Sequence, residues 1–305
     1  MKRNVDNIFV IAQKEFADSV WSSRFYLILG IFMFIVLANS YQAGQSISGA
    51  NFFGDYSPLS AGFISLSYPI SLLGGLVAIG LGFDAIVKER TSGSLNVLLT
   101  HPVYRDQVIT GKLIGVMVTL GLVTVISVGA STGVMLSVSG IIVSTEVIGR
   151  IIVFILLAFL VMLSYLSLSV AVSVFTKEST NSLIYSATAW LALSVLLGMV
   201  ASTIAGVIIG QSTYSEDAYS YEKKYKITRD IMYLSPSTDF MELITGLAGM
   251  PGGDRTPEMR GLFDTGFTLG YWVEQNWVNL IMLLIIPVIL LLVSYMAFMR
   301  QDITV

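Results

Sequence analysis

Long uncharged stretches alternate with short charged segments along the whole chain. Six stretches of 25 residues or more contain no charged side chain: 25–54, 56–83, 113–145, 151–176, 179–215 and 275–299. About 20 apolar residues are enough for a helix to cross the hydrocarbon core of a bilayer. Within the stretches apolar residues follow one another without the alternation that a strand of a membrane barrel would show. The pattern predicts an all-α polytopic membrane protein with six transmembrane helices.

The composition also indicates a membrane protein, and it limits the kinds of functional site that the chain can hold. Apolar residues make up 54% of the chain and charged residues 12%, with a mean hydropathy of +0.78, whereas a soluble domain carries about 25% charged residues. The net charge of −3 predicts no nucleic-acid partner. The chain has no cysteine and a single histidine, His101. We therefore predict no catalytic, cofactor-binding or metal-binding residue, and no enzyme.

The charged segments divide the chain into four parts. Residues 1–24 predict an amphipathic elbow helix, and residues 25–210 hold the first five transmembrane helices with a cytoplasmic loop at 84–110. Residues 211–276 form an extracytoplasmic segment, and 277–305 hold the sixth helix and the C-terminus. The trimmed spans are 25–44, 60–83, 111–137, 151–175, 182–210 and 277–299.

Lysine and arginine are distributed unevenly between the two sides of the membrane. The side that carries both termini holds ten of them, while the opposite short loops hold only Arg150. Short cytoplasmic loops carry the excess of positive charge in membrane proteins. Both termini are therefore predicted to be cytoplasmic, in a multi-pass protein of the inner (plasma) membrane.

The N-terminal segment is amphipathic. Apolar residues recur at helical spacing over residues 4–23, with Lys14 and Glu15 among the polar positions and Trp21 and Arg24 near the first span. Such a helix can lie in the lipid headgroup region. The alternative is a soluble cytoplasmic helix.

Residues 211–276 are the one sizeable polar region, where acidic residues outnumber basic ones. Ser235-Pro236 predicts an N-cap and first turn of a helix that runs through Leu243 and ends near Gly246. The region could bind a substrate or an extracytoplasmic partner protein, or it could be a passive cap.

The trimmed spans hold no charged residue except Lys112, near the cytoplasmic end of the third. Carriers that are driven by ion gradients usually keep ionisable side chains at membrane depth, so such a carrier or a channel is disfavoured. Serine is plentiful in the spans, with no histidine or buried lysine to activate it. We interpret these serines as helix-packing residues.

The cytoplasmic loop 84–110 contains a short predicted helix with an apolar face. Thr91 or Ser92 can cap this helix, and Pro102 ends it. One face of the helix carries three leucines at i, i+3 and i+4, which we call the leucine ridge: Leu95, Leu98 and Leu99. This ridge either packs on the bilayer or on the chain's own elbow helix, or it docks into a partner.

The same loop resembles the cytoplasmic signature of ABC-2 type transporter permeases. The resemblance rests on Glu89, Arg90, Gly93, the leucine ridge, Pro102, Arg105 and Gly111-Lys112. Lys14-Glu15 followed by Arg24-Phe25 is similar to the elbow helix of that family. Asp84-Ala85-Ile86 resembles the branch that includes the permease for nitrous-oxide-reductase copper maturation.

The resemblance implies an exporter subunit that works as a homodimer in membrane lipid. ATP and Mg²⁺ would be bound by a separate ATP-binding subunit, and this chain contains no G-x-x-x-x-G-K-[ST] phosphate loop. Helix 92–100 would couple the two subunits, and spans two and five would form the dimer seam and the translocation path. The residues implied at the coupling contact are Glu89, Arg90, Gly93, Leu95, Leu98, Leu99, Pro102 and Arg105.

The alternative to a transporter is a protein of a different class. It would be a membrane scaffold that transports nothing and presents 211–276 to a partner protein. A gene for an ATP-binding protein beside this one would favour transport over this alternative.

Overall fold

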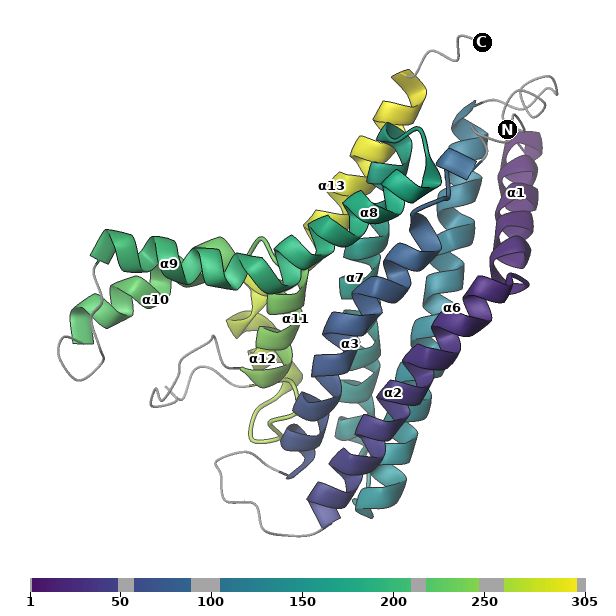
Figure 1. Ribbon diagram of the computed structural model, residues 1–305. Coiled ribbons are helices and arrows are strands. Elements are labelled where there is room, and N and C mark those ends of the chain that lie inside the picture. Colours follow the sequence, from purple (N-terminus) through teal and green to yellow (C-terminus); the bar gives the residue numbers. More distant parts are fainter. Residues whose placement is uncertain (1, 49–57, 89–104, 210–217, 247–260, 301–305) are drawn as a thin grey trace.

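The computed structural model describes residues 2–48, 58–88, 105–209, 218–246 and 261–300 (Figure 1). All regular structure in these ranges is helical, and six helical stretches are long and apolar enough to cross a membrane. The prediction of an all-α protein with six transmembrane helices is confirmed.

Four long helices form the body of the bundle. They are α2 (Ser23–Ser48), α3 (Pro58–Gly82), α6 (Arg105–Ser139) and α7 (Thr145–Phe175). Helix α2 packs on both α3 and α6, and α3 packs on α7. The last helix, α13 (Trp277–Arg300), packs on α7 (Figure 1). The first turns of α1 and the end of α13 lie at the same end of the bundle, as an even number of spans requires.

A cluster of aromatic side chains is buried between the N-terminal halves of α3 and α7. The rings of Phe63 and Phe263 are stacked with centroids 3.5 Å apart, and Phe154 meets both of them edge-on. All three side chains are buried. Residue Phe263 belongs to the predicted polar segment 211–276, so part of that segment packs inside the bundle.

The predicted N-terminal helix is present as α1 (Lys2–Val20). A tight turn at Trp21–Ser22 separates it from α2, where the hydroxyl of Ser22 accepts a hydrogen bond from the backbone nitrogen of Phe25 and donates one to the carbonyl of Ser19. This serine therefore caps the end of one helix and the start of the next. The placement of α1 at the membrane surface stays a prediction.

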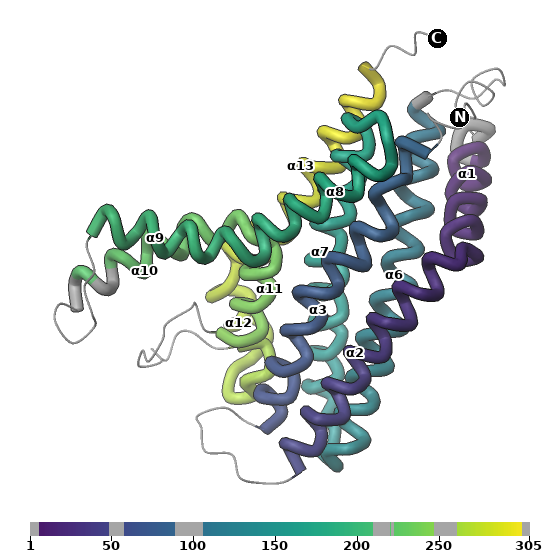
Figure 2. Tube along the Cα trace, in the orientation of Figure 1, coloured from purple at the N-terminus to yellow at the C-terminus, as the bar shows by residue number. Residues whose placement is uncertain are grey.

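The fifth span bends away from the bundle. It consists of α8 (Ser179–Leu191), a π-helical turn, η1 (Ala192–Leu196), and α9 (Leu197–Ile209). Figure 2 shows α9 leaving the bundle sideways, with α10 (Ala218–Met232) packed along it. Single turns of π-helix are rare and occur often at functional sites.

The remaining helices are short. Helix α11 (Pro236–Thr245) has Ser235 as its N-cap, and its C-cap, Gly246, adopts a φ of +64°. Both predicted boundaries are confirmed. Helix α11 packs on α3, α7 and α13, and α12 (Leu269–Gln275) precedes α13. Ser71 and Tyr165, which lie near the middle of α3 and α7, both contact Ser237 on α11, so α11 lies beside the middle of two spans.

Candidate functional site

Most residues of the predicted coupling contact lie outside the described residues. These are Glu89, Arg90, Gly93, Leu95, Leu98, Leu99 and Pro102. Arg105 is the first residue of α6. The structure does describe both flanks of this segment: the chain that leaves α3, and the first turns of α6.

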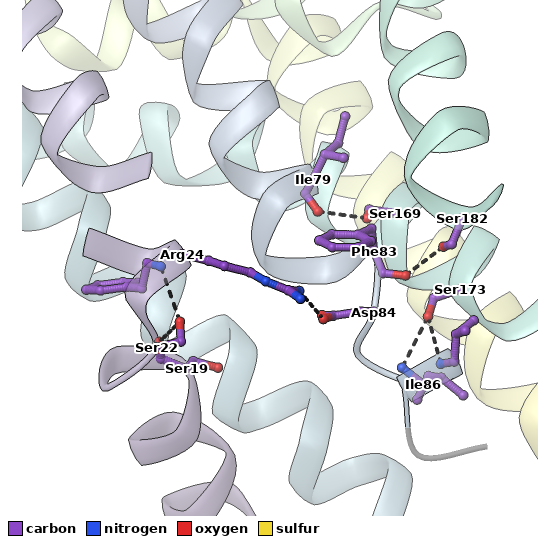
Figure 3. Close-up of polar contacts among 12 residues, drawn as sticks. Ser19, Ser22, Arg24, Ile79, Phe83, Asp84, Ile86, Ser169, Ser173 and Ser182 are labelled. Carbon is purple, nitrogen blue, oxygen red and sulfur yellow. Dashed lines mark hydrogen bonds and ion pairs between the residues drawn. The ribbon is translucent and has the colours of Figure 1, made fainter. Parts of the chain in front are cut away.

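Three serines hold the chain where it leaves α3 (Figure 3). The hydroxyl of Ser173 on α7 accepts hydrogen bonds from the backbone nitrogens of Ile86 and Val87, at 3.1 and 3.2 Å. The other two serines bind carbonyl oxygens: Ser182 on α8 donates to Phe83 at 2.6 Å, and Ser169 on α7 donates to Ile79 at 3.3 Å. We call Ser169, Ser173 and Ser182 the serine clamp.

The serine clamp provides hydrogen-bond partners for backbone groups at the end of α3. The last carbonyls of a helix have no partner within the helix, and a buried backbone group without a partner is costly. The carbonyl of Ile79 also accepts from the backbone nitrogen of Phe83, so Ser169 is its second donor. Ile86 and Val87 are both buried. Hydroxyls from α7 and α8 provide partners at this point, so the chain that enters the coupling segment is bonded to both of these helices.

An ion pair ties the same flank to the start of α2. Arg24 lies 2.9 Å from Asp84, and its guanidinium also approaches the ring of Phe83. The Arg24 side chain is 70% exposed, and an exposed pair stabilises a protein by only about 0–1 kcal/mol. The pair therefore adds little to the stability of the fold, but it links the α3 exit to the start of α2.

The other flank of the coupling segment is held by α1. Lys112 on α6 donates to Glu15 on α1 at 2.8 Å, and the lysine side chain is only 6% exposed. Two glycines make this close crossing possible. A Cβ at Gly111 would lie 2.8 Å from the Cβ of Ile11, and one at Gly115 would lie 2.7 Å from the Cβ of Glu15.

A polar cleft of about 470 Å³ separates the two flanks. The predicted elbow residues Lys14, Glu15 and Arg24 all line it, together with Asp84 and Lys112. The structure therefore brings the elbow residues together with both flanks of the coupling segment. The sequence predicted the individual residues but not these pairings.

A buried arginine lies at the far end of α7. The sequence placed Arg150 in a short loop, but α7 begins at Thr145 and Arg150 is fully buried within it. Its guanidinium donates to the carbonyls of Leu262 and Phe267 and pairs with Glu146 at 2.7 Å. Arg150 thus fixes the chain that precedes α12 to the bundle.

Helix α11 carries a buried acidic side chain that the sequence analysis did not single out. Asp239 has no exposed surface, and neither of its carboxylate oxygens has a hydrogen-bond partner. Asp239 lies one residue before Phe240 and four residues before Leu243, and both of these apolar residues are buried. This helical spacing is the sequence signal that could have placed Asp239 on the buried face of α11. One turn further along α11, Glu242 accepts a hydrogen bond from Asn279 at 2.6 Å, and Arg229 lies 4.0 Å away.

Comparison with known proteins agrees with this arrangement. Residues 9–303 match the ABC-2 family transporter protein family. A probable ABC transporter permease protein NosY from Stutzerimonas stutzeri is 30% identical over 138 residues, which is 45% of this chain and 49% of the relative.

A protein of the same name from Pseudomonas aeruginosa is 32% identical over 124 residues, 41% of this chain and 44% of the relative. The chain thus aligns with about half the length of these relatives. The family match, by contrast, extends over nearly all of this chain and includes most of α1, both flanks of the coupling segment and α13. The chain belongs to the ABC-2 family of transporter proteins.

Proposed function

We propose that this chain is the transmembrane permease subunit of an ATP-driven ABC transporter. A separate ATP-binding subunit would hold ATP and Mg²⁺ and would dock on helix 92–100. The observation that carries the proposal is the family match over residues 9–303. Both similar relatives bear the name of a permease, and the sequence contains no phosphate loop of its own.

The geometry at the flanks supports a coupling role for the segment between them. The serine clamp joins the α3 exit to α7 and α8, and the Glu15–Lys112 pair joins the start of α6 to α1. Movement of helix 92–100 would therefore reach four spans and the N-terminal helix through direct contacts. We propose Lys14, Glu15 and Arg24 as elbow residues of this mechanism.

The fifth span supports pairing with a second copy. Large apolar side chains are exposed along α8 and α9, among them Met199 at 66% and Val207 at 82%. Lipid or a second copy can cover such a surface, and two-fold pairs are the commonest oligomers. We propose that the chain works as a homodimer and exports its substrate. We also propose that the segment 211–276 faces an extracytoplasmic partner or that substrate.

The experiment that tests the proposal changes the leucine ridge. Leu98→Asp places a charge on the ridge, whereas Val97→Asp makes the same change on the opposite face of the predicted helix. We expect Leu98→Asp to lose the co-purifying ATP-binding subunit while the permease stays in the membrane, and Val97→Asp to keep it. A complex that survives Leu98→Asp unaltered would overturn the docking assignment.

A further inference from the structure

Helix α11 carries an acidic side chain that is buried and has no partner for its carboxylate. Of the carboxylates in the described ranges, Asp239 alone is both fully buried and without a hydrogen bond to either oxygen. An unpaired ionised carboxylate in a low-dielectric interior costs far more free energy than a neutral one. The side chain therefore needs a bound cation or a proton.

The charged and titratable neighbours of Asp239 do not supply a cation. Helix α3 and the turn η1 contain no charged residue, and the one on α13, Arg300, is at the far end of that helix. On α7 the group that faces α11 is Tyr165, whose hydroxyl lies 2.6 Å from that of Ser237. Arg150 and Glu146, at the start of α7, are engaged with each other.

The nearest cation is directed at another acid. Arg229 on α10 approaches Glu242 at 4.0 Å and stacks over the ring of Tyr233. Glu242 also accepts the hydrogen bond from Asn279. Burial raises the pKa of Glu242 above its ordinary value, and the contacts with Asn279 and Arg229 oppose that shift. An ionised Asp239 three residues away would repel an ionised Glu242, so each carboxylate disfavours the charge of the other.

We propose that Asp239 is a proton-binding site, which holds a proton while α11 is docked among α3, α7 and α13 and releases α11 from the bundle when that proton is lost. An ionisable side chain beside the middle of membrane spans is costly and is therefore a candidate functional group. The sequence argument against ion coupling considered the spans alone, so it did not include this residue. The inference does not depend on the proposed function.

The burial of Asp239 determines whether the docked state of α11 becomes more or less stable as the pH rises. Burial, together with the nearby Glu242, raises the pKa of Asp239 from 3.8 to about 8. The docked state then binds the proton more tightly than the released state. The protonated Asp239 stabilises the docked state fully when the pH is below 3.8, the ordinary pKa of an aspartate. This stabilisation is lost progressively as the pH rises towards about 8, and it changes no further above that value.

Hydrogen exchange of α11 measures this release directly. In lipid nanodiscs, and after correction for the intrinsic exchange rate, protection of the backbone amides of α11 should fall about fiftyfold between about pH 6 and about pH 8. Peptides from α7 serve as the internal reference. A wild-type protein in which α11 and α7 respond alike to pH would overturn the proposal.

Two variants separate Asp239 from other causes. Asp239→Asn imitates the protonated acid, so α11 should stay protected across this range. Asp230→Asn, on the exposed part of α10, should behave like the wild type. An unchanged pH response in Asp239→Asn would overturn the proposal. So would restored protection of the wild type by Mg²⁺ or Ca²⁺ at high pH, because the ligand would then be a metal ion.

Discussion

At the scale of single residues, most hydroxyls in the bundle bond to their own helix. Ser40, Ser67 and Ser164 each donate to the carbonyl four residues earlier, which is a bond within a single helix. The serine clamp differs because its hydroxyls bond to the backbone of a different element. The interpretation of serines as packing residues therefore fits the first group and misses the second.

Loss of the central clamp hydroxyl has a predictable cost. Ser173→Ala removes the hydroxyl that accepts from the backbone nitrogen of Ile86, and a buried amide that loses its partner costs about 1–3 kcal/mol. We expect a lower melting temperature and weaker coupling of ATP hydrolysis in the assembled complex. Ser137→Ala is the matched control, because Ser137 is exposed and bonds only within its own helix.

Thermal unfolding of the purified chain and ATPase assays of the complex would check this prediction. Equal melting temperatures for the Ser173 and Ser137 variants would contradict it. A loss of stability without any loss of coupled hydrolysis would show that the clamp holds the fold but transmits no movement.

The sequence alone identifies some of the important single residues but not the partners with which they interact. Glu15, Arg24 and Lys112 are conspicuous as charges beside long apolar runs, but their partners lie 97 or 60 positions away. Pairing over such a separation depends on helix packing, which no local pattern encodes. Asp239 was missed for a related reason: it stands in a polar segment, and only the docking of α11 buries it.

At the scale of elements, composition predicts which helices exist better than where they end. Six spans and the caps of α11 follow from local sequence. The start of α7 does not, because Arg150 looks like a loop residue until its carbonyl partners are in place. The bend at η1 has no proline or glycine within the π-helical turn itself. The turn packs against α11, a contact that the local sequence does not predict.

The crossing of α1 and α6 gives a test at this scale. Gly111→Val would push a branched side chain into Ile11 and the backbone of Ile8, where even a Cβ is too close. We expect α1 to separate from α6, with loss of the Glu15–Lys112 pair and faster proteolysis within residues 2–20. Gly133→Val is the control, since nothing lies within 4 Å of a Cβ there. Similar cleavage rates for the two variants would show that the crossing tolerates a side chain.

At the scale of the whole molecule, the two ends of the bundle differ in charge and in chemistry. The end that holds the α3 exit also gathers Arg24, Lys112 and the polar cleft. Lys177 follows α7 at this end, and Arg300 ends α13 there. Near the opposite end, Arg150, which is the one lysine or arginine beside a short loop on that side, is buried inside the protein. Burial removes the charge of Arg150 from the surface. The excess of positive charge at the end that holds the α3 exit is therefore larger than the count of lysine and arginine in the short loops suggested.

This asymmetry predicts the orientation, and the absence of cysteine makes the prediction simple to test. Ile142→Cys places a thiol at a position that is 94% exposed, between α6 and α7. Glu178→Cys places one at the exposed start of α8, at the other end. Positive charge keeps its end in the cytoplasm, so a membrane-impermeant maleimide should label Ile142→Cys in intact cells and Glu178→Cys only after the cells are broken. The wild type, which has no cysteine, should stay unlabelled. The reverse pattern would put the coupling segment outside the cell, beyond the reach of ATP, and the proposed function would fail with it.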